Sequence, residues 1–168
     1  QSHSERLALL VEDCLRQANV SLNQLDAVAV SIGPGSYTGL RIGVATAKGF
    51  CYALDKPLIG INTLEAMAHA LAQTYPPGYW FCPMLDARRM EVYCAIFDQQ
   101  LNVIQSTQAR VMEPGAFAAE LSAQRIVFFG DGAAKCRALL SDQPNAIFLN
   151  EVIYPSAVAV GQLAHRAF

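Results

Sequence analysis

A glycine-rich turn offers the clearest binding chemistry in this sequence. It reads Gly33-Pro34-Gly35-Ser36-Tyr37-Thr38-Gly39 and lies between a predicted strand at 27–32 and a predicted helix at 39–54. Such a turn can present backbone N–H groups to an anion or to another backbone. The dinucleotide pattern G-x-G-x-x-G fails because the third glycine comes one residue late, and the P-loop pattern fails because no lysine precedes Lys48. The turn predicts a ligand-facing loop formed by Gly33, Gly35, Ser36 and Thr38, without identifying the ligand.

Two further loops carry groups that could bind a ligand or move a proton. Asp86 and Arg88 bracket a predicted hairpin turn. Asp86 is either a base or ligand, or a turn residue that accepts hydrogen bonds from its own backbone, and we favour the turn. Gly130-Asp131-Gly132 follows a predicted buried strand, where α/β folds often place ligands. A simple strand-to-helix turn explains this second loop equally well.

The residue types that form catalytic and metal centres are not arranged for either purpose. His3, His69 and His165 lack metal-ligand spacing. Neither Ser36 nor Thr38 has an accompanying histidine–aspartate pair, and Ser36 is not in a G-x-S-x-G context. The five cysteines are widely spaced in apolar stretches, which predicts reduced, buried thiols in a cytoplasmic protein. They are Cys14, Cys51, Cys82, Cys94 and Cys136. We therefore predict no catalytic residues and no metal site.

The composition favours a subunit of a larger assembly. Of the 168 residues, 53% are hydrophobic and only 15% are charged, whereas typical soluble domains have about 25% charged residues. The net charge of −2 and the absence of a basic stripe argue against a protein that binds nucleic acid by itself. No apolar run reaches the roughly 20 residues of a membrane span. Because the chain begins at Gln1, we expect it to be a fragment of a longer protein.

The order of predicted elements indicates the α/β class. Ser2 to Glu5 resembles a capping box for a first helix to residue 18. Predicted strands occupy 27–32, 58–61, 80–85, 91–97, 102–111, 125–129 and 146–149, and further helices 39–54, 62–74, 114–121, 133–140 and the segment after Ser156. The turn at 75–78, with two prolines and a glycine, is the best boundary. We expect a first lobe at 1–76, with 155–168 packing back on it, and a second lobe at 77–154.

The helix after the glycine turn carries a ridge of small residues. Gly39, Gly43, Ala47 and Cys51 recur every four residues and therefore share one side of the helix. Each glycine inside a helix costs roughly 1 kcal/mol relative to alanine, so the ridge predicts close approach of a second backbone. That backbone belongs either to the same domain or to another subunit.

Four motifs together resemble the TsaB family, also called YeaZ. They are residues 33–43, Asn62-Thr63-Leu64-Glu65, residues 86–93 and Gly130-Asp131-Gly132, and the opening Ser2-His3-Ser4 is similar to the family's entry into its first helix. The resemblance implies an actin-like (ASKHA, ribonuclease H-like) two-lobed fold. The strands that open the first lobe, with their Asp-Thr-containing loop, have no counterpart in this sequence.

The resemblance also implies a function. TsaB-like chains are noncatalytic scaffold subunits that dimerise with a TsaD-like transferase to form N6-threonylcarbamoyladenosine on tRNA, joined by a TsaE-like ATPase. It implies ATP and a metal ion in the partner subunits, no cofactor on this chain, indirect contact with tRNA, and a homodimer when the chain is alone. The predicted partner interface lies on the first helix and the post-glycine helix. Its residues are Leu7, Leu10, Val11, Cys14, Gly39, Ile42, Gly43, Thr46, Ala47 and Phe50.

Two other functions remain as alternatives. The first is an actin-fold ATPase or kinase-like enzyme that acts alone, which requires ATP binding by the full-length chain and turnover that depends on Asp86 or Asp131. The second is a glycoprotease-like peptidase, which requires a metal or nucleophile that this sequence does not show.

Overall fold

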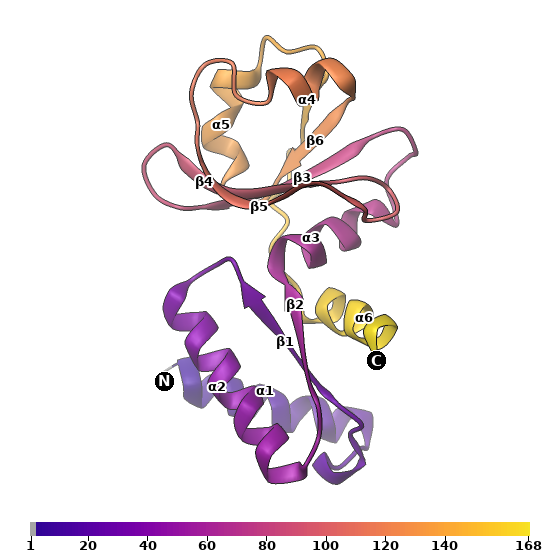
Figure 1. The fold of residues 1–168 in the computed structure, drawn as a ribbon. Helices are drawn as coiled ribbons and strands as arrows, with labels where there is room; N and C mark the ends of the chain where they lie inside the picture. Colours follow the sequence, from indigo (N-terminus) through magenta and orange to yellow (C-terminus); the bar gives the residue numbers. More distant parts are fainter. Residues whose placement is uncertain (1–2) are drawn as a thin grey trace. The chain divides into compact units, whose positions relative to one another are not determined.

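The computed structural model describes residues 3–168, so the predicted capping box that begins at Ser2 lies outside the described residues. The chain forms two compact units. One comprises the chain up to Asn62 together with Val160–Phe168, and the other is Thr63–Ala159. Figure 1 colours these segments along the sequence. No helix within residues 3–168 has both the length and the apolar character to cross a membrane.

The first unit is built around a strand–helix–strand motif. Its elements are α1 (His3–Ala18), the 3-10 helix η1 (Leu22–Gln24), β1 (Val28–Gly33), α2 (Tyr37–Leu54) and β2 (Leu58–Asn62). The strands β1 and β2 pair in parallel, with Val28 opposite Leu58, and α2 is the crossover between them. The hydroxyl of Ser36 accepts a hydrogen bond from the Gly39 N–H at 3.3 Å and caps α2. The helix therefore begins at Tyr37, two residues before its predicted start.

The second unit is a five-stranded mixed sheet with helices on both faces. Its strands are β3 (Trp80–Asp86), β4 (Glu91–Phe97), β5 (Val103–Val111), β6 (Ile126–Phe129) and β7 (Ala146–Phe148), in the order β5-β4-β3-β6-β7. The first three form the predicted antiparallel meander, and β6 and β7 are parallel to β3. Its helices are α3 (Thr63–Ala72), α4 (Ala118–Ala123) and α5 (Ala133–Leu140). Figure 1 shows α3 on one face of the sheet and α4 and α5 on the other.

Alternate residues of the central strands build two cores. Phe81 and Leu85 pack with Leu64 and Met67 of α3. Cys82, Met84 and other residues of the opposite face pack with Leu121 of α4 and with Cys136 and Leu140 of α5. This is the period of two that a sheet covered on both faces requires.

The structure divides the chain earlier than the predicted boundary at 76. The helix α3 belongs to the second unit because its apolar face, which includes Leu64, Met67 and Leu71, is buried against the five-stranded sheet. At the other end, α6 (Ala157–Ala167) begins after Ser156, whose hydroxyl accepts a hydrogen bond from the Val158 N–H at 3.2 Å.

The prediction of a helix at 114–121 was wrong about where the helix starts. In the structure α4 begins only at Ala118. Gly115 and Phe117 have φ values of +85° and +61°, and these left-handed conformations cannot continue a right-handed helix. The pattern of apolar residues gave no indication of them.

Candidate functional site

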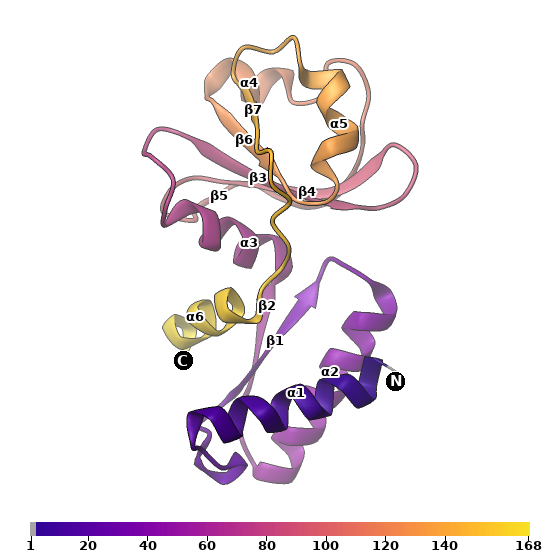
Figure 2. The same ribbon diagram turned by 180° about the vertical axis from the view of Figure 1, so that it is seen from behind.

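The predicted partner interface lies where α1 crosses α2 within the first unit (Figure 2). A hollow of about 330 Å³ is lined by Arg6, Leu7, Leu10, Gly39, Ile42 and Gly43. A second, of about 140 Å³, lies where α1, α2 and β1 meet and includes Leu7, Val11, Gly43, Thr46, Ala47 and Phe50 in its lining. Every predicted interface residue except Cys14 therefore lines one of these two hollows. Within the first unit α1 and α2 contact each other, and the two hollows leave this contact incompletely filled.

The ridge of small residues on α2 faces this incompletely filled region. A Cβ atom added to Gly43 would lie 3.7 Å from Val30 Cγ2, an ordinary van der Waals contact, and one added to Gly39 would touch only Ser36. Packing within the chain therefore does not require glycine at either position. On α1, Leu9 and Leu10 are 53% and 63% exposed. The same-domain explanation of the ridge accounts for its position facing α1, but not for the glycines themselves.

The glycine turn before α2 is shaped mainly by the start of the helix. Gly33 has a φ of +111°, and its added Cβ would lie 3.3 Å from Leu40 Cδ1. Ser36 serves as the N-cap of α2. Gly35 and Thr38 are exposed. Of the two hydroxyl groups that were predicted to face a ligand, that of Ser36 therefore has a structural role as the cap of α2.

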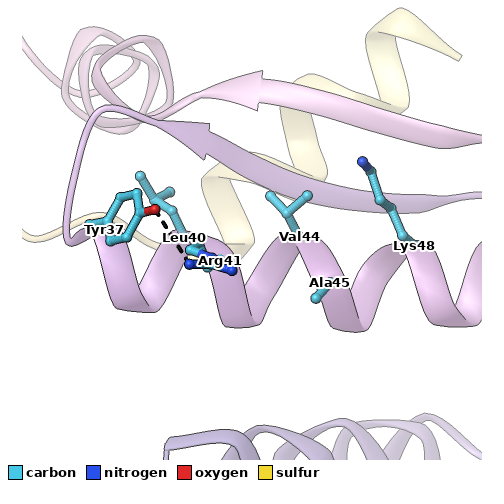
Figure 3. A pocket seen from close by; sticks show the side chains of 6 residues that line it. All are labelled: Tyr37, Leu40, Arg41, Val44, Ala45 and Lys48. Carbon is cyan, nitrogen blue, oxygen red and sulfur yellow. Dashed lines mark hydrogen bonds between the residues drawn. The ribbon is translucent and has the colours of Figure 1, made fainter.

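Sequence reasoning missed a groove along the exposed side of α2. It has a volume of about 410 Å³ and is lined by Tyr37, Leu40, Arg41, Val44, Ala45 and Lys48 (Figure 3). Nη1 of Arg41 donates a hydrogen bond to the Tyr37 hydroxyl at 3.4 Å. The spacing of residues 37, 41 and 48, which share one side of a helix, could have indicated this groove.

In the second unit, the structure brings the two other predicted loops together. Asp131 Oδ1 accepts a hydrogen bond from the Asp86 N–H at 3.0 Å, and Asp86 Oδ1 accepts one from the Arg88 N–H at 2.7 Å. A Cβ atom at Gly130 would collide with the backbone oxygen of Met84, and one at Gly132 would lie 2.9 Å from the carbonyl carbon of Leu85. Both glycines are needed because the loop after β6 passes directly against the backbone of β3.

Lys135 ties these loops to the β3–β4 turn, and sequence reasoning did not identify it. Its ammonium donates to Asp86 Oδ1 at 2.7 Å, to the carbonyl of Arg89 at 2.8 Å and to that of Glu91 at 2.7 Å. Arg88 and Arg89 have φ values of +70° and +43°, so the lysine stabilises a turn of two left-handed residues. Its position in the first turn of α5, just after the Gly-Asp-Gly loop, is the sequence feature that could have indicated a role for Lys135 at these loops.

The environment of Asp86 suits a structural anion better than a general base. The hydrogen bond from Lys135 and that from the backbone of Arg88 hold the pKa of Asp86 below its usual range. A general base works best with a pKa near the working pH, and a lowered carboxylate pKa moves away from it. The geometry therefore matches the turn interpretation of Asp86 and Arg88.

Replacing Lys135 with methionine should lower the free energy of unfolding by about 1–3 kcal/mol, because the turn carbonyls would lose a charged hydrogen-bond donor. Chemical denaturation at pH 7 measures this change. A matched replacement of the exposed Lys48 with methionine should change stability by less than about 0.5 kcal/mol. Equal stabilities of the two variants would contradict the role of Lys135.

Asp86→Asn should reduce stability at pH 7 and have little effect near pH 2. The pKa of Asp86 is lowered by folding, so its ionised form stabilises the protein above the unfolded pKa of about 3.9. This contribution is lost as the pH falls through the folded-state pKa. Urea denaturation of both proteins across this range measures the difference. The same loss at both ends of the range would contradict the ion pair.

The cysteines differ in part from their predicted burial. Cys82, Cys94 and Cys136 are buried, Cys51 is partly buried, and Cys14 is exposed because it lies on the open side of α1. Burial raises the pKa of Cys136 to about 11, which keeps its thiol protonated. Within the described part of the chain, no group of three or more His, Cys, Asp or Glu residues is arranged to hold a metal ion.

The chain matches known proteins over most of its length. The model of a family described as "TsaD: tRNA N6-adenosine threonylcarbamoyltransferase" matches residues 1–160. The "tRNA threonylcarbamoyladenosine biosynthesis protein TsaB" of Haemophilus influenzae is 37% identical over 93 residues, which are 55% of this chain and 39% of that protein. TsaB of Escherichia coli K12 is 34% identical over 111 residues, 62% of this chain and 45% of that protein. The matches thus span less than half the length of these relatives.

Solved structures show the same relationship. A Pseudomonas aeruginosa protein described as similar to peptidase YEAZ superposes with a TM-score of 0.80 at 27% identity, over 99% of this chain and 77% of that one. A second structure, YeaZ from Pseudomonas aeruginosa, has a TM-score of 0.78 at 26% identity, over 98% of this chain and 77% of that one. The mixed α/β fold of this chain is thus similar to that of YeaZ. From its family match and these relatives, the chain belongs to the TsaD family and, within it, to the TsaB (YeaZ) group.

Proposed function

We propose that this chain is a noncatalytic scaffold subunit that associates with a TsaD-like transferase in the formation of N6-threonylcarbamoyladenosine on tRNA. The observation that carries the proposal is the incompletely filled contact between α1 and α2. Its hollows of about 330 and 140 Å³ are bordered by glycines that the chain's own packing does not require. An apolar helix from a partner fits such a surface, because small residues let helices approach closely.

The proposed assembly assigns the chemistry to other subunits. ATP and the metal ion belong to the partners, a TsaE-like ATPase joins the complex, and tRNA is held mainly elsewhere. The surface of α1 and α2 supports a homodimer when no partner is present, because a self-complementary patch readily forms a two-fold interface. We place the complex in the cytoplasm, where tRNA is modified.

The finer fold is also part of the proposal. Within residues 3–168, the sheet of the first unit consists of β1 and β2. An isolated pair of strands is marginally stable. We infer that this unit is the part of an actin-like lobe that lacks its opening strands, and that further strands complete it along β1.

The two enzyme alternatives receive less support. If an ATPase or kinase used Asp86 as its base, the hydrogen bond from Lys135 would lower the pKa of that base, away from the working pH near which a general base is most effective. For the peptidase, only the wording of one relative's description is favourable.

Replacing Gly43 with leucine tests the proposed interface. The new side chain would enter the hollows between α1 and α2, where a methyl-sized atom meets only Val30 at 3.7 Å. Leucine also has a higher helix propensity than glycine, so the fold should persist. Affinity for the TsaD-like partner should fall about tenfold or more, since about 1.4 kcal/mol of lost contact gives that factor.

The matched control is Gly49→Leu. Gly49 lies in the same helix with nothing within 4 Å of its added Cβ, and we expect that variant to bind the partner normally. Calorimetric titration gives both affinities. Wild-type binding by a folded Gly43→Leu variant would contradict the proposed interface.

A further inference from the structure

The groove on the exposed side of α2 combines an aromatic ring with two cations. Tyr37 is 74% exposed, and Arg41 and Lys48 are exposed on the same side of the helix. Figure 3 shows Tyr37 and Arg41 joined by their hydrogen bond, with Lys48 two turns further along α2. Seven residues of helix separate the two cations by about 10.5 Å along the axis.

The charge of the groove has one sign. The sequence of α2 contains Arg41 and Lys48 but no aspartate or glutamate, although the whole chain has a net charge of −2. In the part of the chain that the structure describes, neither cation forms a salt bridge. The charge of the groove therefore favours an anionic ligand.

The ring of Tyr37 adds a second requirement. The Arg41 guanidinium carbon lies 5.5 Å from the centroid of this ring, and its Nη1 donates a hydrogen bond to the Tyr37 hydroxyl. The guanidinium has further N–H groups that can donate to a ligand. Leu40 and Val44 supply an apolar lining. A flat ring beside an anion would stack on Tyr37 while its charge met the cations.

We propose that this groove binds a single-stranded segment of RNA, with a base stacked on Tyr37 and backbone phosphates on Arg41 and Lys48. Stacking on aromatic side chains beside a positively charged groove is how proteins bind single strands, and single-stranded loops are the usual targets in folded RNA. The choice of RNA rests on the proposed function in tRNA modification. The groove supplies a local contact and leaves the main tRNA affinity to other subunits.

The test is fluorescence anisotropy with a labelled twelve-nucleotide uridine strand, titrated at several salt concentrations into the full-length chain, whose net charge of −2 predicts weak but salt-dependent binding. Arg41→Gln and Lys48→Gln should each weaken binding and reduce the slope of log affinity against log salt by about 0.7, the value for one lost phosphate contact on a single strand. Tyr37→Ala should weaken RNA binding about fivefold to 100-fold, whereas Tyr37→Phe, which keeps the ring, should retain most of the wild-type affinity.

Lys56→Gln is the matched control, because Lys56 follows α2 outside the groove. Affinities and salt slopes of the Arg41 and Lys48 variants equal to those of this control would overturn the proposal. Loss of binding to the TsaD-like protein with unchanged RNA affinity would also overturn it, because the groove would then be a protein contact. The isolated chain is used for the RNA titration, so a failure of partner association tests the proposed function separately.

Discussion

Replacing Gly130 with alanine is expected to lower the free energy of unfolding by about 2–5 kcal/mol. The φ of Gly130 is +99°, a conformation that costs an L-residue about 1–2 kcal/mol. The added methyl group would also collide with the backbone oxygen of Met84, and overpacking typically costs about 1–3 kcal/mol. Because this oxygen belongs to a central strand of the sheet, the collision cannot be relieved by turning a side chain. Denaturant unfolding at constant pH measures the loss.

Gly78 provides the control that separates the two causes. Its φ of +94° is close to that of Gly130, but nothing lies within 4 Å of its added Cβ. Gly78→Ala should therefore cost only the conformational part, about 1–2 kcal/mol. If both variants lost the same stability, the close approach of the β6–α5 loop to β3 would not explain the glycine at 130.

Leu10→Glu is expected to weaken association with the TsaD-like partner by at least about 100-fold. The side chain of Leu10 is 63% exposed and lines the larger hollow between α1 and α2. In the proposed complex this position is covered, so glutamate would lose an apolar contact and bury an unpaired charge. The isolated chain should remain folded because the side chain is exposed there.

Gln17→Glu is the matched control for this variant, because Gln17 is also exposed on α1 and its replacement adds the same single negative charge. It should bind the partner within about twofold of the wild type, since exposed surface charges contribute little. Surface plasmon resonance with the immobilised partner compares the three proteins. Similar losses for both variants would show a general charge effect and no specific contact at Leu10.

The elements whose apolar residues follow a clear period could be predicted from the sequence. Apolar runs predicted β1 and β6, and turn residues predicted the meander of β3, β4 and β5. Each predicted end of these strands lies within two residues of the observed end. The start of α4 could not be predicted from the apolar pattern, because Phe117, whose side chain is fully buried, has a left-handed backbone conformation that few non-glycine residues adopt.

The candidate sites were predictable to different degrees. Spacing along two helices identified the residues that line the hollows between α1 and α2, because each set shares a helix face. The Lys135 contacts could not be found in this way, since the ammonium meets Asp86 across 49 positions of sequence. The groove at Tyr37 was missed because the predicted helix began at 39, which left that ring in the turn.

Light scattering coupled to size-exclusion chromatography, with the full-length chain alone and mixed with its TsaD-like partner, tests the central claim most directly. The scaffold role predicts that a homodimer of the chain is replaced by a heterodimer in the mixture, and that the Leu10→Glu variant fails to form it. Two folded proteins that elute separately at micromolar concentrations would contradict the proposed interface and the scaffold function that rests on it.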